Sequence, residues 1–141
     1  MTTAYTAVNV KTGTPSDVKT MPQHVTTQIV SQAVDTSFAV GDTISGPILP
    51  AGAYLWDLIL DVTDIDSGST CLLDVGIPGT AQKFLAASTV GQAGGVVHGA
   101  KAGMLGYSPT SNTPILVTCN ATANTAAAGT VIIGISYTMD P

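Results

Sequence analysis

The fold of this chain is decided in its middle, where the residues from Leu60 to Gly76 read LDVTDIDSGSTCLLDVG. Nearly half of the nine acidic residues lie here, namely Asp61, Asp64, Asp66 and Asp74. A calcium loop, an acidic active site and the tip of a β-hairpin are the three structures that could account for the stretch. An EF-hand loop that started at Asp64 would have glycine at position 5 and valine at position 12, where calcium ligands are required. The calcium loop is therefore disfavoured.

Apolar residues alternate with polar ones on both sides of this stretch, and the alternation predicts two β-strands. The predicted inward residues are Tyr54, Trp56, Leu58, Leu60 and Val62 in the first strand and Cys71, Leu73, Val75 and Ile77 in the second. In a hairpin with Ser67 and Gly68 at its tip, inward residues of the two strands lie opposite one another, in the pairs Val62–Leu73, Leu60–Val75 and Leu58–Ile77. The same register places Asp61 directly opposite Asp74 on the outer face, where like charges are destabilising.

The opposed carboxylates of Asp61 and Asp74 admit three explanations. Solvent can screen the two charges, a lysine such as Lys83 or Lys101 can bridge them, or a cation or a partner subunit can bind there. Asp61 and Asp74 are therefore the candidate pair of metal ligands. The sequence predicts no other metal site and no cofactor.

The composition indicates an all-β protein. The chain of 141 residues suits one domain, and it contains neither glutamate nor arginine. Apolar residues make up 45% of the chain and charged residues only 9%, whereas surface helices are usually built from Glu, Lys, Arg and Gln. The predicted fold is an antiparallel β-sandwich, jelly-roll-like, with an extended N-terminal arm. So few charges also indicate that partners cover part of the surface.

Charge and hydropathy exclude some partners. The formal charge of −5 and the lack of a basic cluster disfavour nucleic acid, because phosphate neutralisation needs Lys and Arg. No apolar run approaches the length of a transmembrane helix, so no membrane partner is expected. The first residues lack the basic and apolar regions of a signal peptide, so the chain is expected to stay inside the cell with its cysteines as thiols.

The rest of the chain divides into an arm and a domain. Residues 1–24 are expected to be either a disordered tail or an extended arm that adds to a neighbouring subunit, and residues 25–141 a single β-sandwich domain. Further strands are predicted at 25–34, 36–44, 115–121 and 130–138, with a turn at 45–52 and a long glycine-rich loop, holding at most one short strand, at 78–113. The candidate interface residues are Tyr5, Val8, Val10, Met21, His24 and His98.

No catalytic set can be assembled, and the chain is not predicted to be an enzyme. Cys71 and Cys119 each lie on a predicted inward face, where a free cysteine behaves as a small apolar residue. His24 and His98 are far apart in the sequence, and the glycine-rich loop lacks the spacing of a phosphate-binding loop. The single tryptophan, Trp56, is predicted to point inward, which counts against sugar binding.

Several segments, taken in order, resemble a known family. They are ILPAGAYLWDLILDVTDIDSGSTCLLDVG (48–76), FLAAS (84–88), GY (106–107) and TPILVTCNATANTAAAGTVIIGISYT (113–138). This order is similar to small β-sandwich structural proteins of tailed bacteriophages and prophages, the accessory virion proteins called decoration or cement proteins. The resemblance covers residues 36–138.

That resemblance implies a jelly-roll-like fold and a structural role. Such proteins sit on the capsid exterior, bind the major capsid protein and commonly assemble as homotrimers that lock neighbouring capsomers. Assembly would take place in the host cytoplasm, with final localisation in the virion. The alternative is a head-fibre or adhesin-type binding module that recognises a host surface glycan.

Overall fold

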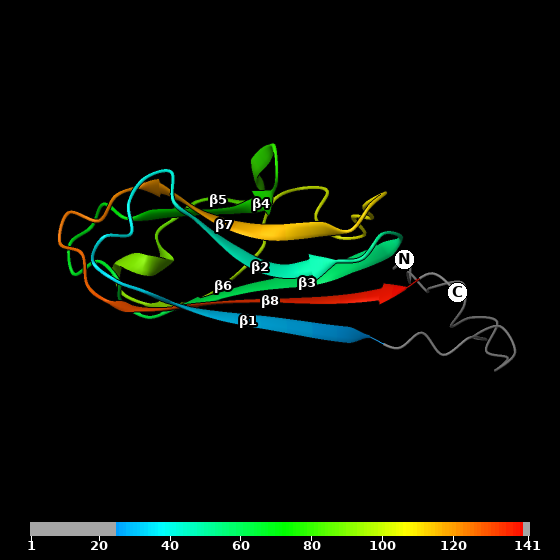
Figure 1. The fold of residues 1–141 in the computed structure, drawn as a ribbon, viewed down its shortest axis with the longest axis horizontal. Helices are drawn as coiled ribbons and strands as arrows, with labels where there is room; N and C mark the ends of the chain where they lie inside the picture. Colours follow the sequence, from blue (N-terminus) through cyan, green and yellow to red (C-terminus); the bar gives the residue numbers. More distant parts are fainter. Residues whose placement is uncertain (1–24, 140–141) are drawn as a thin grey trace, which may run out of the picture.

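Residues 25–139 are described by a computed structural model and form two four-stranded sheets packed face to face (Figure 1). The strands are β1 (Thr26–Val34), β2 (Thr43–Leu49), β3 (Ala53–Val62), β4 (Leu72–Ile77), β5 (Thr80–Ser88), β6 (Gly95–His98), β7 (Thr113–Ala121) and β8 (Gly129–Met139), with a 3₁₀ turn, η2 (Val90–Gln92), between β5 and β6. Sheet A has the order β1-β8-β3-β6 and sheet B the order β2-β7-β4-β5. The predicted all-β sandwich is therefore confirmed. In this part of the chain no helix is long and apolar enough to cross a membrane.

The strand pairing is nested around the middle of the chain. β4 pairs with β5, β3 with β6, β2 with β7 and β1 with β8, and every pair is antiparallel. Two further antiparallel pairings, β3 with β8 and β4 with β7, join these four pairs into the two sheets. A long antiparallel ribbon rolled up in this way is a jelly roll.

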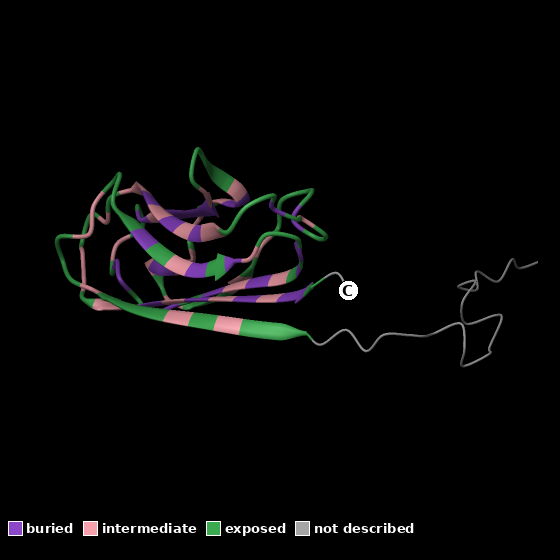
Figure 2. Ribbon diagram, turned by 45° about the vertical axis from the view of Figure 1, so that its right-hand side comes forward, coloured by how far each residue is buried: buried purple, intermediate pink, exposed green. Residues whose placement is uncertain are grey.

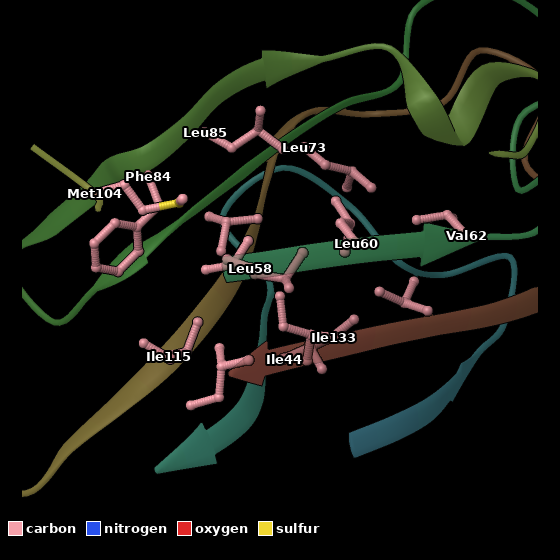
Figure 3. Packing of buried hydrophobic residues seen from close by; sticks show 14 of the residues in the cluster. Ile44, Leu58, Leu60, Val62, Leu73, Phe84, Leu85, Met104, Ile115 and Ile133 are labelled. Carbon is pink, nitrogen blue, oxygen red and sulfur yellow. The ribbon is translucent and has the colours of Figure 1, made fainter. Parts of the chain in front are cut away.

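The core lies between the two sheets and consists of the inward-facing residues of strands in which buried and more exposed residues alternate. Its fully buried members include Leu58, Leu60, Val62, Val131, Ile133 and Ile135 from sheet A and Leu73, Val75, Ile115 and Val117 from sheet B. Figure 3 shows Leu58 and Leu60 of β3 among side chains from both sheets, Leu73 and Ile115 included. The strands predicted at 115–121 and 130–138 are confirmed as β7 and β8.

The predicted hairpin between β3 and β4 is wrong. β3 lies in sheet A and β4 in sheet B, and the chain crosses from one sheet to the other between Val62 and Leu72. Asp61 therefore pairs with residues of β6 and β8, whereas Asp74 pairs with Thr118 of β7. Alternation of apolar and polar residues shows which residues face the core, but it does not show which strands pair. Two strands in facing sheets can both point their apolar residues into one core, as two paired strands can.

The crossover between the sheets is held by the carboxylate of Asp66, which is fully buried. Its Oδ1 accepts hydrogen bonds from the backbone N–H groups of Gly68 at 2.8 Å and Thr125 at 3.1 Å. Its Oδ2 accepts from the N–H groups of Thr70 at 3.0 Å and Cys71 at 2.8 Å. Since Thr125 lies in the loop between β7 and β8, one side chain both shapes the crossover and fastens it to the last connection of the sandwich.

Three other segments differ from the prediction. Residues 36–42 form turns and irregular backbone, so β2 begins only at Thr43. The turn predicted at 45–52 is mostly strand, because Pro47 lies at a register shift of an edge strand, where proline is tolerated. The glycine-rich segment 78–113 contains two strands, β5 and β6, rather than at most one.

Asp74 secures two irregularities of sheet B. It is only 4% exposed and accepts hydrogen bonds from the side chains of Gln82 (3.1 Å) and Asn120 (3.0 Å) and from the backbone N–H of Ala87 (2.7 Å). The register of β4 shifts against both β5 and β7 near these donors, and Ala87 has a φ of 51°, which non-glycine residues adopt mainly where a bulge or turn requires it. Neutral donors therefore surround the carboxylate of Asp74.

We expect the substitution Asp74→Ala to lower the free energy of unfolding by about 2–3 kcal/mol, because it removes the charged acceptor of the part-buried hydrogen bonds from Gln82, Ala87 and Asn120. The matched substitution Asp61→Ala, on an exposed residue, should change it by less than about 0.5 kcal/mol. Urea unfolding curves of both variants measure these values. Equal losses would contradict the different surroundings of the two carboxylates.

The free energy of unfolding should depend on pH through the ionisation of Asp66. Burial raises the pKa of its carboxyl, but the four backbone N–H groups lower it more, so the folded-state pKa lies below the ordinary value of 3.8. The stabilisation is therefore complete above the ordinary pKa and is lost as the pH falls through the lowered folded value. We expect Asp66→Asn to be less stable than the unsubstituted chain at neutral pH, with a gap that narrows below about pH 4. Urea unfolding across a pH series measures the gap, and a gap independent of pH would refute this role.

Candidate functional site

The face of sheet A that points away from the core, the outer face of sheet A, carries exposed apolar side chains on three strands. Ile29 of β1 is 66% exposed, Tyr54 and Trp56 of β3 are 39% and 49% exposed, and Val96 of β6 is 59% exposed. Figure 2 shows β1 exposed along most of its length. Exposed apolar side chains gathered on one face indicate a surface that another protein covers.

Two of these side chains owe their exposure to a β-bulge in β3. The register against β8 advances by one residue between Leu55 and Asp57, so Trp56 is an extra residue in the strand. Leu55 and Leu58 are both fully buried, although three steps along the strand separate them. The prediction that Tyr54 and Trp56 point into the core is therefore wrong, and both rings lie on the outer face.

Hydrogen bonds fix several side chains on this face. The indole Nε1 of Trp56 donates to Oγ1 of Thr138 at 2.7 Å, which orients the ring while leaving part of it exposed. Nδ1 of His98 on β6 lies 2.9 Å from Oδ1 of Asp57 on β3. The surface is thus preorganised, and less side-chain entropy would be lost when a partner binds it.

The outer edge of β1 is the second binding feature. β1 pairs with β8 on one side and is the last strand of sheet A on the other. Its nine residues, TTQIVSQAV, include no charged residue and no proline. Natural proteins usually place charged residues or proline on edge strands, because these residues prevent pairing with other chains. The edge is therefore chemically suited to accept an added strand.

The sequence-predicted ligand pair is not brought together. Asp61 lies on the outer face of sheet A and Asp74 in sheet B, so the cross-strand pair behind the metal hypothesis does not form. Within residues 25–139, no group of three or more His, Cys, Asp or Glu residues could hold a metal ion. The ion pair found in the same residues joins His98 to Asp57, and the ammonium of Lys83 lies 4.8 Å from the ring centroid of Tyr107. In this described part of the chain, no lysine forms an ion pair with either Asp61 or Asp74.

One of the six predicted interface residues can be placed. His98 is exposed on β6, beside Asp57, at the border of the outer face of sheet A. The other five, Tyr5, Val8, Val10, Met21 and His24, lie outside the described residues.

Cys71 and Cys119 are free thiols in the core, each 1% exposed. Burial and, to a smaller extent, the charges of Cys119 and Asp66 raise the pKa of Cys71 to about 11. Burial likewise raises the pKa of Cys119. Since the thiolate is the reactive form, both cysteines behave as apolar core residues near neutral pH.

Sequence reasoning missed the exposed residues Ile29, Tyr54 and Trp56. A one-residue bulge leaves no mark in the alternation that precedes it, so nothing in the sequence distinguishes Trp56 from an inward residue. In residues 25–34 the apolar residues fall on both faces of the strand, so their spacing does not show which face is inward. The absence of charged residues from this strand is the available signal for an open edge.

Comparison with known proteins identifies the kind of assembly in which this fold occurs. No family model and no curated protein matches the chain. A chain in the capsid of Ralstonia phage GP4 is 32% identical, with a TM-score of 0.74, and the match covers 84% of this chain and 86% of that one. A chain in the Cyanophage Pam1 capsid asymmetric unit is 27% identical with the same TM-score and coverage.

A third structure shares the fold alone. A chain in the acidic stable capsid structure of Helicobacter pylori bacteriophage KHP30 is 20% identical, with a TM-score of 0.58, and the match covers 83% of this chain and 93% of that one. The resemblance to virion proteins of phages is thus confirmed by structural comparison. With 32% identity across 86% of the GP4 capsid chain, this chain belongs to the family of bacteriophage capsid-associated proteins.

Proposed function

We propose that this protein binds the exterior of the phage capsid and cements the junctions between capsomers, as a homotrimer whose partner is the major capsid protein. Its action would be mechanical. Contacts that span a junction must break before neighbouring capsomers separate, so they raise the barrier to expansion or rupture of the shell.

The main observation that supports this proposal is the exposed apolar outer face of sheet A. It occurs in a chain that belongs to a family of capsid-associated proteins. Trp56 and Tyr54 are the kind of large, oriented aromatic residues that dominate binding energy at protein interfaces. The face also carries few charges, in keeping with a chain of only 9% charged residues. Its association with a partner would therefore depend on apolar burial more than on electrostatic attraction.

The uncharged edge of β1 supports a second kind of contact. A strand added there from a neighbouring subunit would gain main-chain hydrogen bonds along up to nine residues. Main-chain hydrogen bonds across a subunit junction resist separation without requiring charged side chains.

The exposed aromatic rings also favour a second candidate function, recognition of a host surface glycan by a head-fibre or adhesin-type module. Sugar-binding surfaces use exposed aromatic rings. The prediction that Trp56 points inward counted against this function, but Trp56 is exposed. A glycan-array signal that disappears in the variant Trp56→Ala would favour the second function over cementing.

The proposed function predicts that phage particles lacking this protein rupture at a lower temperature and under a milder osmotic shock than complete particles. Adding the purified protein back should restore both resistances, because the cross-junction contacts form again. DNA release measured with an intercalating dye during heating and dilution follows rupture. Particles that lack the protein and keep the same resistance would contradict the cementing role.

A matched pair of substitutions tests which surface meets the capsid. We expect Val96→Lys, on the outer face of sheet A, to weaken binding to protein-deficient particles by about tenfold or more, since it places a charge in an apolar contact. Ile48→Lys, on the edge strand β2 of sheet B, alters a residue of similar exposure, 53% against 59%, and should leave binding unchanged. Co-sedimentation with particles measures both affinities, and the opposite order of effects would exclude the outer face of sheet A as the contact surface.

A further inference from the structure

A hollow opens on the outer face of sheet A above Gly134. β8 lies between β1 and β3 in sheet A (Figure 1). In the register of these strands, Gly134 of β8 pairs with Ile29 of β1 on one side and with Ile59 of β3 on the other. Because glycine has no side chain, the two isoleucines border a space of about 190 Å³, and Ile132 lines it as well. We call this space the Gly134 slot. Its walls are largely apolar.

The charge at the rim of the slot is unbalanced. Asp57 and Asp61, both on β3, line it, but only Asp57 is already engaged, by the imidazole of His98, whose Nδ1 lies 2.9 Å from its carboxylate. Within residues 25–139, Asp61 takes part in no ion pair. An apolar slot with a carboxylate at its rim fits a long basic side chain, whose methylene stem packs between Ile29 and Ile59 while its cation stays at the rim beside Asp61.

The distribution of lysines within the chain points to the source of that side chain. Residues 25–139 contain two lysines and seven aspartates, which gives them a formal charge of −5. Residues 1–24 contain Lys11, Lys19 and a single acid, Asp17, and have a formal charge of +1. The segment before the sandwich is therefore electrostatically complementary to it.

Lys11 fits the slot better than Lys19 does. Asp17 is two residues from Lys19 in the sequence, so the two charges offset one another locally. The corresponding neighbours of Lys11 are Asn9 and Gly13, which carry no charge. Lys11 also follows a short apolar run that contains Val8 and Val10, which suits contact with the apolar surroundings of the slot.

The direction of β1 favours the segment of a neighbouring copy over the chain's own. β1 runs from Thr26 to Val34, so its axis continued backwards past Val25 leads away from Ile29 and the slot. An own segment would have to reverse direction to reach the slot. Fourteen steps along the chain separate Lys11 from Val25, and such a length spans up to about 50 Å when extended, enough to reach an adjacent subunit.

We propose that the Gly134 slot of one copy receives the side chain of Lys11 from a neighbouring copy, with Asp61 as its counter-charge. This inference rests on the proposed function, since it supplies a contact for the homotrimer. An exposed ion pair contributes little by itself, so burial of the lysine stem provides most of the affinity and Asp61 provides selectivity for a basic residue.

Charge reversal tests the contact in the full-length protein. We expect Asp61→Lys and Lys11→Asp each to weaken self-association about tenfold or more, because each sets like charges against one another. The double variant, which restores opposite charges, should associate within about threefold of the unsubstituted chain. An equimolar mixture of the two single variants should associate more tightly than either alone, because every contact between unlike copies is again complementary. Sedimentation velocity over a concentration series measures all four samples.

Two controls separate the contact from general effects. Lys19→Asp makes the same charge change in the same segment and should leave association unchanged. Gly134→Leu fills the slot and should weaken association as the charge reversals do. A Cβ at Gly134 meets only ordinary contacts, Ile29 Cγ1 at 3.6 Å and the Gln28 carbonyl at 3.7 Å, so the fold is retained, and thermal unfolding checks this.

The possible results have distinct meanings. A monomeric unsubstituted chain, a double variant that stays weakened, or a mixture no tighter than its components would overturn the inference. The proposed cementing role would survive any of these results if the unsubstituted protein still restored resistance to deficient particles, although a monomeric chain would contradict the homotrimer. Failure of that particle assay would overturn the proposed function whatever the sedimentation results.

Discussion

The structure depends on the passage of the chain from one sheet to the other between Val62 and Leu72, and that passage depends on the carboxylate of Asp66. Its two oxygens accept hydrogen bonds from four backbone N–H groups, three in the crossover itself and one, that of Thr125, in the loop between β7 and β8. Unsatisfied buried N–H groups are costly, so a side chain without this acceptor would favour a different path. With the crossover fixed, β3 and β4 lie in opposite sheets, and the nested pairing of the remaining strands follows.

Much of the fold could be predicted from alternation, because alternation reports which side chains are buried. It located β3, β4, β7 and β8. It could not identify partners, because Leu60 and Val75 face the same core whether their strands are paired or stacked. The prediction allowed at most one short strand within 78–113 because the many glycines around β5 and β6 resemble a loop, although neighbouring strands supply the hydrogen bonds that make both of them strands.

The candidate site was harder to predict because it depends on irregularities. One extra residue in β3 turns Trp56 and Tyr54 to the surface, and similar register shifts in sheet B enclose Asp74 among donors from β5 and β7. A bulge changes the direction of a side chain without changing residue type, so the sequence carries no local sign of it. The predicted hairpin would have placed Asp61 opposite Asp74, but the two residues have different roles. Asp74 secures the irregularities of sheet B, and Asp61 lies at the rim of the Gly134 slot.

A single account connects these features with the family of capsid-associated proteins. The chain has few charges, an apolar outer face on sheet A and an edge strand, β1, without charge or proline, and all three suit a subunit that is covered by its neighbours. The most direct test of this account is a cryo-electron microscopy reconstruction of intact particles at a resolution that traces the chain. The account predicts density for this protein on the capsid exterior across capsomer junctions, with the outer face of sheet A against a neighbouring subunit. Density at the tip of a fibre, or a sandwich whose outer face of sheet A lies open to solvent, would contradict it.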